Sequence, residues 1–135
     1  MQTLRIGRVA RESGISIEAI RFYEQEGLLP KPARALSGYR NYQPEAIVRL
    51  RFIRHAKELG FSLREVRELL SLRVERGTTC GQVRRQAQHK IADIEQRIKK
   101  LARMKQALDR LSAACSGRGP TRGCPILDAL ENEET

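Results

Sequence analysis

The sequence predicts a mainly α-helical protein: a winged helix-turn-helix domain, then a long antiparallel coiled-coil helix, then a C-terminal loop. Three observations predict this. Two short helical patterns joined by a glycine-containing turn open the chain. A stretch that contains neither Gly nor Pro runs from Gln82 to Ser116. The formal net charge is +10 and the isoelectric point is near 10.3, which favours a polyanionic partner such as nucleic acid.

The first 30 residues have the pattern of a helix-turn-helix. We expect a first helix over residues 4–13 with Ile6, Val9 and Ala10 inward, followed by a tight turn at Gly14. Ser16 is placed to cap a second helix over residues 17–26, which stops at Gly27. The second helix of such a pair enters the major groove of DNA, so the motif and the charge together predict double-stranded DNA as a partner.

Residues 30–41 suit a wing, meaning a loop or small β-ribbon that lies along the DNA backbone. The segment holds two prolines and Ser37-Gly38. Tyr39 and Arg40 would offer a hydroxyl and a charge to phosphate, whereas a structural role is a fair alternative for Tyr42. On the second helix, Arg21 can reach a phosphate or a guanine edge, or pair with Glu18 or Glu24 instead.

Residues 44–74 predict a helix pair. The third helix, over residues 44–59, buries an apolar face and is halted by Gly60. Ser62 and Glu65 form a capping box that opens a fourth helix. We interpret this pair as a second wing in which Arg54 contacts phosphate, with a solvated basic face as the alternative. The inward residues are expected to be Ile47, Leu50, Ile53, Ala56, Val66, Leu69 and Leu70.

The stretch from Cys80 onward predicts one long coiled-coil helix. Thr79 and Gln82 fit a capping pair at its start, and Gly117 with Pro120 fits its stop. Apolar residues recur at alternating steps of three and four, interrupted by Lys105, and this spacing is typical of a dimer seam. We therefore expect a DNA-binding domain over residues 1–75, a hinge and dimerisation helix over 76–114, and a loop with a short tail over 115–135. The seam residues are Ala87, Ile91, Ile94, Ile98, Leu101 and Leu108.

The length of that helix constrains the three cysteines. Cys80 and Cys115 would lie about 52 Å apart at roughly 1.5 Å per residue, whereas a zinc–sulfur bond is only about 2.3 Å. In an antiparallel homodimer, however, Cys80 of one chain would approach Cys115 and Cys124 of the other. Three thiolates suit a thiophilic divalent ion in trigonal geometry, namely Hg(II), Cd(II) or Pb(II), whereas Zn(II) prefers four ligands. Three unrelated structural cysteines are the alternative.

Composition narrows the class of protein further. The chain shows no signal peptide and no apolar run that could span a membrane, and its cysteine count is odd. These features favour the cytoplasm and reduced thiols. We find no paired carboxylates in a pocket-forming context, no nucleophile with a base partner and no phosphate-binding glycine loop, so we do not expect an enzyme. A thiol protein that buffers metal or senses redox state without touching DNA is the competing class. The acidic tail, Asp128, Glu131, Glu133 and Glu134, reads as solvated.

Several segments together resemble the MerR family of regulators, over nearly the whole chain. They are "IGRVARESGISIEAIRFYEQEGLLP", "GYRNY" and "RLRFIRHAKELGFSLREVRELL", and the terminal "ACSGRGPTRGCPIL" resembles the family's metal-sensing branch. The resemblance implies a homodimeric activator at a promoter whose two polymerase elements are spaced too far apart. Metal binding would make the dimer distort the DNA and realign those elements for RNA polymerase.

The resemblance also assigns roles to particular residues. Cys115 and Cys124 match the loop ligands, and Cys80 stands where divalent sensors have Cys and monovalent copper and gold sensors have Ser. This implies a divalent effector, Hg(II) first, with Cd(II), Pb(II) or Zn(II) possible. Zinc-sensing members carry an extra loop Cys and a His, where this chain has Ser116 and no histidine. The DNA-binding candidates are Arg21, Tyr23, Tyr39, Arg40 and Arg54, together with Ser16 at the start of the second helix.

Overall fold

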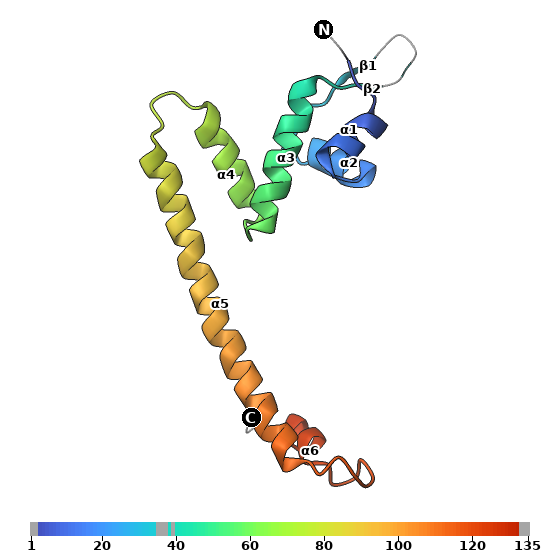
Figure 1. Ribbon diagram of the computed structural model, residues 1–135, viewed down its shortest axis with the longest axis vertical. Coiled ribbons are helices and arrows are strands. Elements are labelled where there is room, and N and C mark those ends of the chain that lie inside the picture. Colours follow the sequence, from blue (N-terminus) through green and yellow to red (C-terminus); the bar gives the residue numbers. More distant parts are fainter. Residues whose placement is uncertain (1–2, 35–37, 39, 133–135) are drawn as a thin grey trace. The chain divides into compact units, whose positions relative to one another are not determined.

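The computed structural model describes residues 3–34, 38 and 40–132, and it is mainly helical, as predicted (Figure 1). The chain divides into two compact units, Met1–Gln86 and Ala87–Thr135. Helix α5 passes from the first unit into the second. The elements are α1 Ile6–Ser13, α2 Ile17–Gln25, β1 Ala33–Arg34, β2 Arg40–Asn41, α3 Pro44–Glu58, α4 Leu63–Val74, α5 Cys80–Ala114 and α6 Pro125–Glu131.

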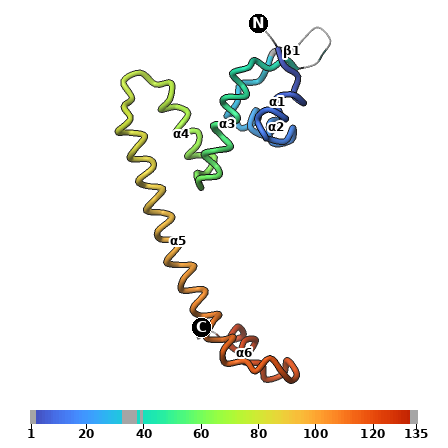
Figure 2. Tube along the Cα trace, viewed as in Figure 1, coloured from blue at the N-terminus to red at the C-terminus, as the bar shows by residue number. Residues whose placement is uncertain are grey.

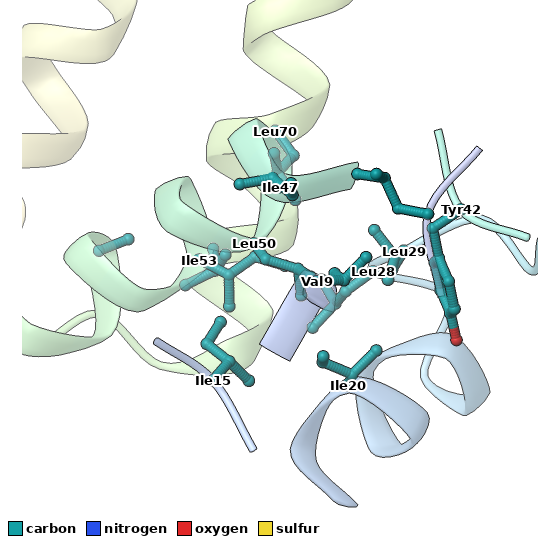
Figure 3. Close-up of a cluster of buried hydrophobic side chains, with 13 residues drawn as sticks. Val9, Ile15, Ile20, Leu28, Leu29, Tyr42, Ile47, Leu50, Ile53 and Leu70 are labelled. Carbon is teal, nitrogen blue, oxygen red and sulfur yellow. The ribbon is translucent and has the colours of Figure 1, made fainter. Parts of the chain in front are cut away.

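The core of the first unit lies between its helices. Helix α1 packs against α2 and α3, and α3 packs against α4. Figure 3 shows the centre of this core, where Val9, Ile20 and Leu50 are fully buried. The predicted inward faces of α3 and α4 are confirmed, except that Leu69 is only partly buried. The confirmed residues are Ile47, Leu50, Ile53, Ala56, Val66 and Leu70.

Local signals set most helix ends as predicted. Ser16 Oγ accepts a hydrogen bond from the Ala19 amide at 3.1 Å and so caps α2. Both halves of the Ser62–Glu65 capping box are present at the start of α4. Gly14 ends α1 with a φ of 74°, a left-handed conformation that glycine adopts without steric cost. The helix-turn-helix therefore follows from short-range chemistry.

The start of the first helix was predicted wrongly. Helix α1 begins at Ile6 rather than Leu4, because Leu4 bonds to Tyr42 instead. The Leu4 amide donates to the Tyr42 carbonyl at 2.8 Å, and the Tyr42 amide donates back at 2.7 Å. This antiparallel bridge joins the N-terminal segment to the end of the wing.

The predicted ribbon is present as a small antiparallel sheet. Strands β1 and β2 pair with Ala33 opposite Asn41 and Arg34 opposite Arg40. The residues between the strands that carry the predicted tip, 35–37 and Tyr39, lie outside the described residues. The ribbon is short, so its placement depends on what holds its base.

Helix α5 is 35 residues long and begins at the first cysteine. The Thr79 amide donates to Gln82 Oε1 at 2.9 Å, which is the Gln82 half of the predicted capping pair. Within the first unit, Gln86 Nε2 also donates to Glu68 Oε2 of α4 at 3.3 Å. None of the described helices combines the length and the apolar character needed to cross a membrane.

The second unit ends in a loop and a short helix (Figure 2). We expected only a tail after the second loop cysteine, but residues Pro125–Glu131 form α6. Proline suits the first position of a helix, because the N–H that it lacks would have no partner there. The negative charge of Asp128 in the first turn interacts favourably with the positive end of the helix dipole. Glu133 and Glu134 of the predicted acidic tail lie outside the described residues.

Candidate DNA-binding surface and thiol site

Helix α2 presents a polar edge beside its buried face. Ile20 is fully buried, whereas Arg21 is exposed. Tyr23 is half-buried and packs on the core, and its ring lies 5.9 Å from that of Phe22. Phe22 is 44% exposed, so α2 also presents an aromatic ring on its surface. The exposed side chains of α2 can therefore contact a ligand while the buried face of the helix stays packed in the core.

The base of the wing is joined to α2 through a buried carboxylate. Glu24 is only 4% exposed, and its two oxygens accept from Arg40 Nη1 and from the Tyr42 hydroxyl. Tyr42 is 1% exposed, so its reading as a structural tyrosine is confirmed. Because Glu24 is occupied by the wing, the expected alternative of an Arg21–Glu24 pair is wrong. Arg40 keeps about a third of its side chain exposed.

Two arginines of α3 reach back to the helix-turn-helix. Arg51 donates to the Glu12 carbonyl from Nε at 3.2 Å and from Nη2 at 2.9 Å, which satisfies an otherwise unpaired group at the end of α1. Arg54 lies across the turn, where a Cβ on Gly14 would come within 1.9 Å of its Nη1. Its Nε is buried and 3.8 Å from a Glu58 oxygen. Arg54 thus lies beside the turn between α1 and α2.

Helix α5 carries an exposed apolar stripe on the predicted seam. Within the second unit Ile98, Leu101 and Leu108 are each about 60% exposed. Ile91 and Ile94 are 53% and 38% exposed. An amphipathic helix that leaves such a stripe uncovered in one chain is typical of a coiled-coil partner face.

The loop after α5 brings two of the three cysteines together. Cys115 and Cys124 both line a hollow of about 460 Å³. The pKa of the Cys124 thiol is lowered below its usual value, mainly by hydrogen bonding to the backbone amides of Leu127 and Ile126 and then by the Cys115 side chain. The Gly117 amide donates to Cys115 Sγ at 3.4 Å.

The third cysteine occupies the opposite end of the helix in sequence. Cys80 is exposed and is the first residue of α5, whereas Cys115 follows its last residue. Among the described residues, no three His, Cys, Asp or Glu side chains lie close enough to hold a metal ion. One chain thus supplies a pair of thiols and, elsewhere, a single exposed thiol.

Glu24 is a functional candidate to which sequence reasoning assigned no role of its own. It lies four residues after Ile20 and seven after Ile17, and this spacing places a carboxylate on the apolar face of α2. A charge on a buried face requires a partner, so the pattern could have identified it. The identity of the partners, Arg40 and Tyr42, had no such local signal.

The fold and its exposed groups define a winged helix-turn-helix protein with a thiol-bearing helical extension. Residues 4–73 match the family described as "MerR HTH family regulatory protein", and residues 47–111 match "MerR, DNA binding". The mercuric resistance operon regulatory protein of Serratia marcescens is 38% identical over 134 residues, which are 99% of this chain and 92% of that protein. The chain belongs to the MerR family, whose members are DNA-binding transcription regulators and not enzymes.

Two solved structures are similar over nearly the whole chain. One is the regulator PbrR691 from Ralstonia metallidurans in complex with lead(II), with a TM-score of 0.82 and 35% identity, covering 94% of this chain and 98% of that one. The other is MerR from Bacillus megaterium in complex with mercury(II), with a TM-score of 0.72 and 32% identity, covering 96% of this chain and 100% of that one.

Proposed function

We propose that this protein is a metal-responsive transcriptional regulator that binds promoter DNA as a homodimer. It activates transcription by distorting the DNA when a thiophilic divalent ion, Hg(II) first, binds three thiolates. Two of them are Cys115 and Cys124 of one protomer, and the third is Cys80 of the other. The observation that carries the proposal is the pairing of Cys115 with Cys124 in a loop at the end of α5. The alternative effectors are Cd(II), Pb(II) and Zn(II), in a sensor that controls efflux genes.

The donor set favours a soft ion. Thiolates rather than thiols ligate metals, and the hydrogen bonds that lower the pKa of Cys124 favour its thiolate. A pair of sulfurs offers an incomplete site, so a third sulfur is needed for trigonal ligation. Within one chain that sulfur is missing from the loop, because the only other cysteine is Cys80. A second chain can supply it.

The relatives support this reading of the site. The similar protein from Serratia marcescens is named for mercuric resistance, and the two similar solved structures hold lead(II) and mercury(II). All three are at least 32% identical to this chain and are matched over more than nine-tenths of its length. These names favour a heavy divalent ion.

Coupling between the thiols and DNA would act at the start of α5. Residues 75–79 join Cys80 to α4, and Gln86 of α5 bonds to Glu68 of α4. Ligation at Cys80 therefore acts within a few residues of the end of the predicted DNA-binding domain, residues 1–75. Metal can shift the dimer toward the DNA-distorting form only by the difference in its affinity for the two forms. RNA polymerase would then act at the realigned promoter.

Mixed dimers test the shared site directly. One protomer carries Cys80→Ser, and the other carries Cys115→Ser with Cys124→Ser, each with its own affinity tag so that only heterodimers are purified. A site shared between antiparallel protomers is rebuilt once in the heterodimer, whereas a site within one chain is rebuilt nowhere. We expect the heterodimer to activate in-vitro transcription with Hg(II), and each parental homodimer to stay inactive while still binding DNA.

The same assay separates the effectors. Transcription is measured with Hg(II), Cd(II), Pb(II) and Zn(II) side by side on the protein's own promoter. An inactive heterodimer, or a Cys80→Ser homodimer that is still fully induced, refutes the shared site. If the wild-type chain binds no promoter DNA, its proposed role as a regulator is refuted instead.

A further inference from the structure

The carboxylate of Glu24 links the recognition helix to the wing. It lies in the last turn of α2 and is 4% exposed. One oxygen accepts from the guanidinium of Arg40 in β2, and the other accepts from the hydroxyl of Tyr42, just after β2. Tyr42 in turn is bonded through its backbone to Leu4. One side chain therefore joins two elements that are expected to contact DNA separately.

This position is unfavourable for an acid unless its partners are in place. The carboxyl end of a helix carries a partial negative charge, and burial removes water from the carboxylate. Arg40 supplies the compensating charge. Tyr42 is protonated at neutral pH and donates through its hydroxyl, and burial, followed by the hydrogen bond to Glu24, raises its pKa to about 12. Glu24 thus has one donor on each oxygen.

The same geometry leaves part of Arg40 available. A guanidinium has five N–H donors in a rigid planar fork. Glu24 takes Nη1, and 34% of the Arg40 side chain remains exposed. An arginine held on one side by a carboxylate loses less rotamer freedom when its other side binds a phosphate.

We propose that Glu24 is a positioning residue for DNA binding: it fixes the wing to the recognition helix and aims Arg40 at a backbone phosphate. This inference rests on the proposed DNA-binding function and names a residue through which that function works. Glu24 itself faces the interior and touches no phosphate. The acidic side chain of Glu24 therefore raises the affinity for polyanionic DNA, although its negative charge alone would lower that affinity.

The test compares two acids at the same helix end. Glu26, one residue past α2, is about half exposed and lies 4.0 Å from Arg67 Nη2. Glu24→Gln and Glu26→Gln each remove one negative charge. The affinity of each variant is measured for a palindromic duplex that the wild-type chain has selected from a randomised pool. We expect Glu24→Gln to weaken binding roughly 10- to 100-fold, the scale of a hydrogen bond to a charged group. Glu26→Gln should bind equally or more tightly.

A double-variant cycle with Arg40 separates positioning from folding. On an Arg40→Ala background, Glu24→Gln should cause a much smaller further loss of affinity, because there is no arginine left to aim and only the bond to Tyr42 remains. The salt dependence should also fall by about one phosphate contact in Arg40→Ala and in Glu24→Gln alike. Circular dichroism gives the unfolding transition of each variant, and all affinities are measured at temperatures below it.

Clear outcomes overturn the inference. It fails if Glu24→Gln binds as tightly as Glu26→Gln, or if its loss of affinity persists undiminished without Arg40. If Glu24→Gln does not fold, Arg40→Lys decides: positioning predicts binding as weak as that of Arg40→Ala, whereas a simple charge contact predicts near wild-type binding. If the wild-type chain selects no duplex at all, the proposed DNA-binding function has failed, not this inference.

Discussion

The exposed stripe on α5 gives the sharpest energetic prediction. Leu101 is 61% exposed, and Leu101→Ala removes three carbon atoms from it. Burying a CH₂ group is worth about 0.8 kcal/mol, so covering that fraction in a coiled coil is worth about 1.5 kcal/mol in each protomer. A two-fold dimer counts the change twice, giving about 3 kcal/mol. We therefore expect the dimer dissociation constant to rise roughly 100-fold.

Analytical ultracentrifugation over a concentration series measures this constant. Arg103→Ala is the matched control, because Arg103 is an exposed residue of α5 outside the predicted seam. Its truncation should leave the dissociation constant within a few-fold of the wild type. The reasoning is refuted if Leu101→Ala dimerises as tightly as Arg103→Ala, or if the wild-type chain is a monomer at the concentrations at which it binds DNA.

Three further predictions concern single side chains. Gly14→Ala should lower the free energy of unfolding by roughly 1–2 kcal/mol in urea denaturation, because φ is 74° there, and the loss should largely survive in an Arg54→Ala background. Folding raises the pKa of Tyr42 from 10.0 to about 12, so the stability that the Tyr42 hydroxyl contributes is complete below pH 10 and is lost toward pH 12. Tyr42→Phe should remove that part of the pH dependence of the free energy of unfolding, and an unchanged pH dependence in Tyr42→Phe would contradict the prediction. The pKa of Cys124 is lowered, so the midpoint of its alkylation rate against pH should lie below that of the urea-unfolded chain, as mass spectrometry of its peptide can show.

Elements set by near neighbours were predictable from the sequence. The cap at Ser16, the capping box at Ser62 and the turn at Gly14 each depend on residues within about one helical turn. The buried face of α3 follows from its spacing alone. The two loop cysteines are nine residues apart in the chain, and their role as a pair came from the resemblance to the metal-sensing branch of the family, not from the turn between them.

Contacts between distant residues were decided only by the tertiary structure. The sequence indicated a helix start at Leu4, but the bridge to Tyr42 uses that backbone. The partners of Glu24 lie 16 and 18 residues further along the chain. Arg54 reaches the turn at Gly14 from another helix. Periodicity marks which positions are buried, because burial repeats with the helix. It does not say which charged group meets which, because that depends on how separate elements pack.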